Sequence, residues 1–244
     1  VMGNMIGSGI FLLPASLARF GGVSLIGWLI STAGALMLAL VFARLARIDP
    51  ASGGPYAYTR RAFGDLAGFL VAWGYWISMW TSLGALAVAL VGYLAALIPP
   101  LNATPAVAAG SALIAVWSLV AVNVIGARAA GWVQVVTTVL KLFPLALVAV
   151  LGLTHFDSSR VEIAGASVRT LATDVPAVVA LTLWAFLGLE SATIPAASIE
   201  RPDISIPRAT VVGTVIVAIV YVASAQGAAG FDLAASVETT IPAG

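Results

Sequence analysis

Two ionisable side chains stand inside apolar runs of the sequence, where a charge is costly. Glu190 lies within an otherwise uncharged stretch, and Lys141, the only lysine, lies midway along residues 129–153. Ionisable residues at membrane depth are functional candidates by default. A carboxyl and an amine in such places could take up and release protons, and we predict that role for both. The alternatives are a protonated Glu190 that bonds a neighbouring helix and a Lys141 ammonium that reaches an interface.

Glycine, proline and alanine recur at matching offsets in two distant apolar stretches, residues 6–15 (IGSGIFLLPA) and 187–196 (LGLESATIPA). Glycines favour unwinding, and unwound backbone at membrane depth is tolerated only where it is buried or lines a cavity. The free N–H groups of a half-helix suit a carboxylate. We therefore predict helix interruptions between about Ile6 and Phe11 and between about Phe186 and Ser191. The alternative is that small residues here serve close helix packing.

Other polar and aromatic side chains could complete a site beside these breaks. Trp184 comes just before the second predicted break and could close over a ligand, or it could pack in a core. In the third apolar stretch, Ser78 and Met79 near mid-span could line a cavity, and Tyr75 is a candidate gating residue.

The composition favours lipid as the main solvent. The 244 residues are 61% hydrophobic and only 9% charged, whereas soluble domains typically have about 25% charged residues. With a net charge of +1 and no basic aromatic patch, nucleic-acid binding is not indicated. Cysteine is absent, and the single histidine, His155, falls in a polar loop. These counts argue against disulfides, a metal site or an intramembrane protease, so we expect neither an enzyme nor a cofactor.

A transmembrane helix needs about 20 mostly apolar residues, and seven such candidates follow one another. A proline cluster at residues 99–105 divides one long uncharged stretch into two spans. The polar segment Thr154–Asp174 reads as an external loop. We expect one transmembrane domain over residues 1–244, cut at both ends. The candidate spans are Val1–Ala18, one within Phe20–Ala43, two within Leu66–Ala127, then about Ala129–Leu153, Val175–Ile199 and Ala209–Gly230.

Arginines fall mostly on one side of these spans, which predicts a cytoplasmic side that includes the start of the first span. The two glycine-proline stretches lie five spans apart, so their helices would enter the membrane from opposite sides. This is the arrangement of an inverted repeat, and paired interrupted helices are the best sequence pointer to a transport site. The arginines of the predicted cytoplasmic side are Arg44, Arg47, Arg60, Arg61, Arg128, Arg201 and Arg208, against Arg19, Arg160 and Arg169 on the other.

Four ordered motifs resemble the amino acid–polyamine–organocation transporters. Residues 3–14 (GNMIGSGIFLLP) are similar to that superfamily's first-helix signature, and residues 52–64 (SGGPYAYTRRAFG) to its first cytoplasmic loop. Residues 183–192 (LWAFLGLESA) resemble helix 6 of the basic amino acid and polyamine antiporter branch, which includes arginine/agmatine and putrescine/ornithine antiporters. Residues 200–209 (ERPDISIPRA) are similar to the loop that follows that helix.

The resemblance implies an all-α, leucine-transporter-type inverted-repeat fold of about twelve helices, of which this chain would hold seven. It implies that the first break binds an amino acid α-carboxylate and that carbonyls near Trp184 and Phe186 receive the α-amino group. Trp184 would be a gate, and Asn4 and Glu190 would tune the site or its pH response. The candidate substrate-binding residues are Asn4, Gly7, Ser8, Gly9, Ser78, Met79, Trp184, Ala185, Phe186 and Gly188, and the proton-coupling or gating candidates are Lys141, Glu190 and Tyr75.

Two departures from that branch leave alternatives open. Leu83 stands where the arginine antiporters place an amide side chain, and Lys141 stands where proton-coupled members of the wider superfamily carry lysine. A lysine ammonium that projects toward the first break could replace a sodium ion there. The preferred function is exchange of an amino acid for a related amino acid or amine in the cell membrane. The alternatives are proton-coupled amino acid uptake and, from another class, a channel; protons and a second copy of the chain in a homodimer are further expected partners.

Overall fold

The computed structural model of the chain describes residues 1–7, 9–50, 52–154 and 168–230, and within these it is helical, without a strand. Six helical segments are long and apolar enough to cross a membrane. The fifth, Thr170–Thr193, joins most of α8 to a short 3-10 turn, η3 (Leu189–Thr193). The long helices are α3 (Val23–Ile48), α5 (Asp65–Leu97), α6 (Pro105–Ile125), α7 (Ala127–Thr154), α8 (Val168–Trp184) and α9 (Pro202–Gly230).

The all-α, multi-span prediction is confirmed, with one change in the number of continuous spans. The first predicted span is divided into α1 (Met2–Met5) and α2 (Gly9–Ala18), neither of which could cross a membrane alone. The proline cluster separates α5 from α6, as predicted, and its first residues form the short 3-10 helix η1 (Pro99–Asn102). The assignment of residues 1–244 to a single domain stays a prediction.

Several predicted helix boundaries are wrong, and at each of them the helix extends beyond the predicted limit. α3 continues to Ile48, α9 begins at Pro202 rather than Ala209, and α8 begins at Val168, inside the segment predicted as a loop. The predicted spans ended at the first charged residues. A helix does not have to end there, because its hydrogen bonds are local and it can extend beyond the hydrocarbon core of the bilayer with its charged side chains in water. His155 and the rest of residues 155–167 lie outside the described residues.

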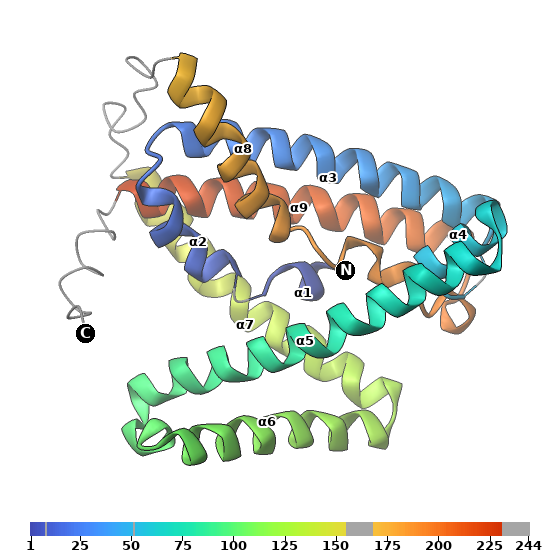
Figure 1. Cartoon of the computed structure of the whole chain (residues 1–244), viewed down its shortest axis with the longest axis horizontal. Coiled ribbons are helices and arrows are strands. Elements are labelled where there is room, and N and C mark those ends of the chain that lie inside the picture. The colour runs from blue at the N-terminus through green and yellow to red at the C-terminus, as the bar shows by residue number, and fades with distance from the viewer. Residues whose placement is uncertain (8, 51, 155–167, 231–244) are drawn as a thin grey trace. The chain divides into compact units, whose positions relative to one another are not determined.

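One compact unit comprises Val1–Pro55 and Thr138–Gly244. In it α3 and α9 lie side by side and run in opposite directions, and α8 packs against α3 (Figure 1). Gly27 lets the α3–α8 pair approach closely, since a Cβ there would overlap the Val178 side chain. The Ser31 and Thr182 hydroxyls meet at 2.7 Å across the same contact. α3 and α9 are the second and seventh predicted spans, so their antiparallel pairing is that expected of an inverted repeat.

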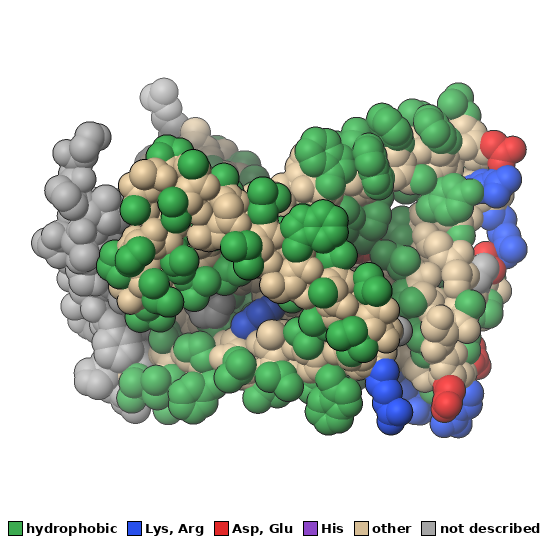
Figure 2. Space-filling model, turned by 90° about the horizontal axis from the view of Figure 1, so that it is seen from below, with side chains coloured by type: hydrophobic (Ala, Val, Ile, Leu, Met, Phe, Trp, Pro, Cys, Tyr) green, Lys and Arg blue, Asp and Glu red, His purple; other side chains and the backbone are tan. Residues whose placement is uncertain are grey.

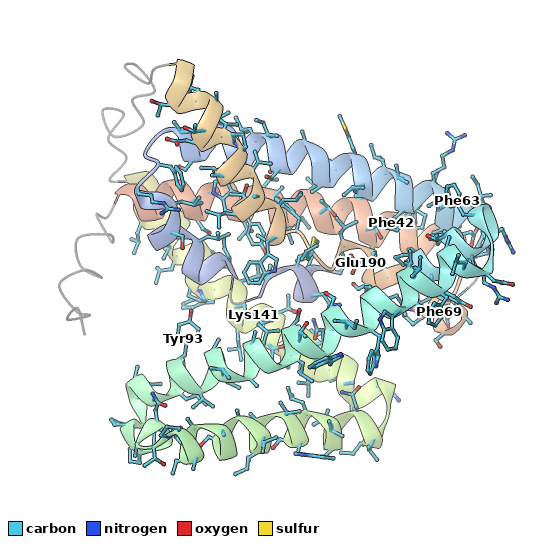
Figure 3. All side chains as sticks on the ribbon, in the orientation of Figure 1. Phe42, Phe63, Phe69, Tyr93, Lys141 and Glu190 are labelled. Carbon is cyan, nitrogen blue, oxygen red and sulfur yellow. The ribbon has the colours of Figure 1, made fainter. Side chains whose placement is uncertain are left out.

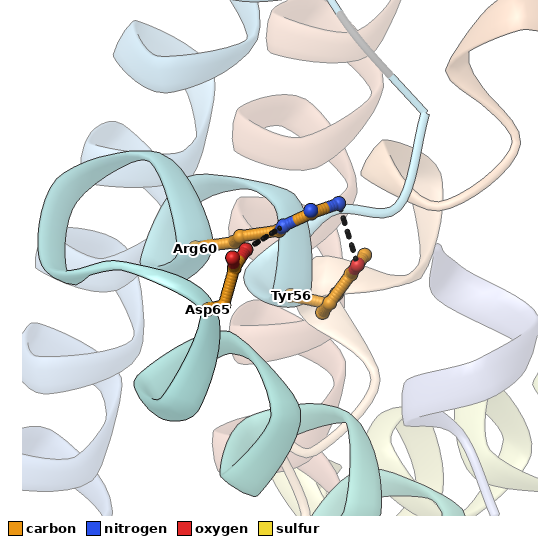
Figure 4. Close-up of polar contacts among 3 residues, drawn as sticks. All are labelled: Tyr56, Arg60 and Asp65. Carbon is orange, nitrogen blue, oxygen red and sulfur yellow. Dashed lines mark hydrogen bonds and ion pairs between the residues drawn. The ribbon is translucent and has the colours of Figure 1, made fainter.

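The second unit, Tyr56–Thr137, contains most of α4 (Pro55–Phe63) and the antiparallel pair α5–α6. Gly64, at φ +90°, makes the turn between α4 and α5. There Arg60 Nε donates to Asp65 at 2.6 Å and Arg60 Nη1 donates to the Tyr56 hydroxyl (Figure 4). The hydrogen bond and charge of Asp65 raise the pKa of the Arg60 guanidinium. This small network links α4, which is not among the candidate membrane spans, to the first residue of α5.

Hydrophobic side chains are spread over much of the face that Figure 2 shows, and few charged side chains appear among them. On α5 an exposed ladder of stacked and tilted rings runs along the helix at spacings of three and four residues. Such a surface suits contact with lipid rather than water. The ladder consists of Phe69, Trp73, Trp76 and Trp80.

Candidate functional site

The first interruption separates α1 from α2, as predicted. α1 ends at Met5, and the N–H of Gly7 bonds back only two residues, to the Met5 carbonyl at 2.9 Å. The next helix begins at Gly9, and the first N–H groups of a helix have no partner within that helix. Ser8, which the sequence places in this break, lies outside the described residues.

The second interruption follows α8, also as predicted, and it begins at Ala185, one residue before the predicted start at about Phe186. From Ala185 to Leu187 each N–H bonds to the carbonyl three residues back instead of four. Gly188 then adopts φ +102°, a left-handed conformation that glycine reaches at little cost. Only 3-10 turns follow up to Ser198, so the predicted continuation of an α-helix to Ile199 is wrong. A left-handed residue and Pro195 both oppose continuation of the α-helix.

The two interruptions are in direct contact through their glycines. A Cβ on Gly188 would lie 3.0 Å from the Cβ of Asn4, and a Cβ on Gly9 would lie 2.7 Å from the Trp184 ring. A side chain at either position would push against its neighbour, so the two glycines favour the close approach of the broken helices. Four of the predicted site residues, Asn4, Gly9, Trp184 and Gly188, are therefore brought together.

The side chains around this contact differ in exposure. Trp184 is 52% exposed, although it lies against Gly9, while the next two residues, Ala185 and Phe186, are buried. The Trp184 ring therefore lies against the first break and is half exposed. Its role as a gate and the core-packing alternative both stay predictions.

Lys141 reaches the first break from α7 (Figure 3). Its ammonium donates to the Ile6 carbonyl at 2.9 Å and lies 3.4 Å from the Gly3 carbonyl. These are carbonyls at the end of α1, where the broken helix leaves acceptors without intrahelical donors. The contact with the first break predicted for Lys141 is present, and its role in proton coupling stays a prediction.

Glu190 lies at the second break, on the segment after α8 (Figure 3). Its carboxylate accepts a hydrogen bond from the N–H of Gly188 at 3.1 Å. Its backbone carbonyl accepts the Thr193 hydroxyl at 2.6 Å. The carboxylate therefore stabilises the left-handed turn locally, a role that sequence reasoning did not assign to it.

Tyr75, Ser78 and Met79 belong to α5, in the second unit. Ser78 and Met79 are exposed and Tyr75 is partly buried. The Ser78 carbonyl accepts the Thr81 hydroxyl at 3.1 Å, a contact within the helix. The participation of these three residues in a substrate site stays a prediction.

Tyr221, on α9, is the residue that sequence reasoning missed. Its hydroxyl donates to the Met5 carbonyl at 2.6 Å and lies 3.2 Å from the Ala185 carbonyl, so it contacts both interruptions. It is the only tyrosine of the last predicted span, amid valine, isoleucine and alanine. A buried phenolic hydroxyl in such surroundings needs an acceptor, and that requirement was the available signal.

Comparison with known proteins gives a consistent result. Residues 1–240 match the family described as amino acid permease. The chain is 40% identical over 240 residues to a cadaverine/lysine antiporter of Escherichia coli (strain K12), covering 94% of this chain and 52% of that protein. It is 37% identical over 231 residues to an arginine/ornithine antiporter of Pseudomonas aeruginosa, covering 91% and 48%. It is 33% identical over 235 residues to the putrescine transporter PotE of Escherichia coli (strain K12), covering 94% and 52%. The chain thus spans about half the length of the curated relatives it matches.

Proposed function

Because the chain belongs to the amino acid permease family, we propose that it is part of a multi-pass secondary transporter that exchanges an amino acid for a related amino acid or amine. Support comes from relatives in the basic amino acid and polyamine antiporter branch, two of which are named for such exchange. The six long apolar helices are those of a multi-pass integral membrane protein. The arginine bias supports a cell-membrane protein whose N-terminal side is cytoplasmic.

The direct contact between the two broken helices is the observation that carries this proposal. In it, the N–H groups at the start of α2 bind the substrate α-carboxylate. Backbone carbonyls near Trp184 and Phe186, where the α-helical hydrogen bonds end, accept hydrogen bonds from the α-ammonium group. Since Gly9 and Gly188 bring the two breaks together, one α-carbon can carry both groups to both partners. Trp184, which covers Gly9, closes over the bound substrate.

Proton-coupled uptake is the second candidate function, and the contact between Lys141 and the first break favours it. An ammonium on those carbonyls occupies a place where a metal cation could bind. Loss of its proton would release the carbonyls and change the break, which links substrate movement to protonation. Because the Lys141 ammonium takes the place of a metal cation, both exchange and proton-coupled uptake should be independent of sodium.

Counterflow in proteoliposomes tests the proposal and separates exchange from a channel. The full-length protein is reconstituted into vesicles loaded with unlabelled substrate, and labelled lysine, ornithine, arginine and their amines are added outside. An exchanger accumulates label faster when substrate is inside. Uptake that internal substrate leaves unchanged would contradict exchange, and uptake driven by a pH gradient into empty vesicles would favour proton coupling.

A further inference from the structure

The hydroxyl of Tyr221 joins the two broken helices through a single proton. It lies 2.6 Å from the Met5 carbonyl of the first break and 3.2 Å from the Ala185 carbonyl of the second. A phenol donates only one hydrogen, so this proton is directed to one carbonyl at a time or shared between them. The hydrogen bond of the Tyr221 hydroxyl therefore restrains the distance between the two carbonyls.

Both carbonyls are acceptors that the breaks have created. In a continuous helix each carbonyl accepts the N–H four residues ahead, but α1 ends at Met5 and α8 ends at Trp184. The Met5 carbonyl accepts a short backbone bond from the Gly7 N–H instead. Backbone acceptors at membrane depth need partners, so the Tyr221 hydroxyl stabilises two interrupted helix ends at once.

The ring that carries this hydroxyl is held rigidly. Tyr221 packs against Trp28 with ring centroids 5.5 Å apart, and against Phe186 with centroids 5.5 Å apart in an edge-on contact. All three side chains are buried, at 0%, 0% and 1% exposure for Tyr221, Trp28 and Phe186. The hydroxyl therefore has a fixed position on α9, and the two breaks are positioned relative to it.

We propose that Tyr221 is a positioning and specificity residue: its hydroxyl sets the spacing of the two broken helices and thereby selects amino acids over the corresponding amines. The inference rests on the proposed function, in which one break binds the α-carboxylate and the other the α-ammonium. An amino acid must contact both breaks from a single α-carbon, so it depends on their spacing. An amine without the carboxylate needs only the second break and tolerates a change in spacing.

The test compares Tyr221→Phe with Thr214→Val in the full-length protein. Tyr221→Phe keeps the ring in its aromatic cluster and removes only the hydroxyl. Thr214 is also fully buried on α9, but its hydroxyl bonds to the Thr210 carbonyl of the same helix at 2.7 Å. Thr214→Val therefore removes a buried hydroxyl whose hydrogen bond lies within α9.

The first measurement is amide hydrogen exchange in the absence of substrate. Tyr221→Phe should speed amide exchange in residues 2–9 and 185–191 and leave the exchange rates of α5 and α6 unchanged. Thr214→Val should leave the exchange rates of both breaks unchanged. Unchanged protection of both breaks in Tyr221→Phe would overturn the positioning role. This measurement needs no transport activity, so it decides the spacing claim even if the proposed function is wrong.

The second measurement is binding of amino acid and amine pairs: lysine with cadaverine, ornithine with putrescine and arginine with agmatine. For the pair that the native protein binds most tightly, Tyr221→Phe should raise the Kd of the amino acid roughly tenfold and that of the amine less than about twofold. An equal rise for both, or none, would overturn the selectivity role. If the native protein binds none of the pairs, the proposed function fails and the selectivity claim fails with it.

Discussion

The two compact units of the chain use polar side chains in different ways. In the unit that contains the breaks, hydroxyls and the lysine bond segments far apart in sequence, as with Ser31 and Thr182 or Lys141 and Ile6. In the α5–α6 pair, the hydroxyls of Thr81 and Ser118 bond carbonyls of their own helices. Burial differs too: 44% of the most apolar 18-residue stretch of α9 is buried, against 0% for α6.

This difference teaches where a membrane protein places its functional groups. A hydroxyl that bonds its own helix is satisfied anywhere in the bilayer, so it says little about tertiary structure. A polar group that bonds a distant break is satisfied in one arrangement only. The first unit therefore carries the candidate site, and matched substitutions in the two units should give unequal results.

The largest expected effect is on proton-driven uptake. Lys141→Ala removes the ammonium from the Ile6 carbonyl and should abolish pH-gradient-driven accumulation, while exchange between identical substrates persists because it needs no net proton movement. Ser118→Ala on α6 is the control and should transport normally. Both variants are measured in proteoliposomes with and without a pH gradient and sodium.

Two results would contradict this prediction. Normal pH-driven accumulation by Lys141→Ala would leave the residue as a structural link between α7 and α1. Stimulation of the native protein by sodium would refute the view that the ammonium replaces a metal cation.

Gly188→Ala should have the next largest effect. The new Cβ would meet Asn4 at 3.0 Å, and a non-glycine residue at φ +102° is strained by about 1–3 kcal/mol. We expect lower stability and at least about a tenfold loss of exchange. Gly92→Ala, in an open position on α5, should be neutral or slightly stabilising, because alanine favours the helix.

Thermal unfolding in detergent and counterflow measure both glycine variants. Equal behaviour of Gly188→Ala and Gly92→Ala would show that the close contact between the two breaks is not required.

Trp184→Ala should impair transport more than folding. The ring is 52% exposed, so its loss removes little core packing, but it uncovers the first break beside Gly9. Trp76→Ala, at 58% exposure on α5, removes a ring of similar exposure and should leave substrate affinity unchanged. Apparent affinity, turnover and melting temperature are compared, and unchanged affinity and turnover in Trp184→Ala would assign the ring to packing alone.

The smallest expected effect concerns the buried hydroxyl pair between α3 and α8. Ser31→Ala removes a bond to Thr182 at 2.7 Å and should cost about 0.6 kcal/mol, the usual value for an interhelical hydrogen bond in a membrane protein. Ser118→Ala should cost less, since its hydroxyl bonds only its own helix. Unfolding titrations in mixed micelles provide the comparison, and a larger loss for Ser118→Ala would reverse it.

Much of this architecture was predictable because its causes are local. Runs of apolar residues predicted the spans, the prolines at 99–105 predicted the turn between α5 and α6, and paired glycines predicted both interruptions. Lys141 was singled out by charge alone, since an amine in an uncharged stretch needs a partner. Family resemblance rested on short ordered motifs, and the comparisons confirm it.

The tertiary structure decided what local chemistry leaves open. Helix ends such as Pro202 and Trp184 depend on what each terminal turn meets, which hydropathy does not contain. Tyr221 and Met5 are 216 residues apart, and only the folded path of α9 past α1 makes them partners. The sequence determined where the chain must break, because glycine and proline act on their own turn. Which groups satisfy the breaks was decided by packing, because a freed carbonyl accepts whichever donor the fold places within reach.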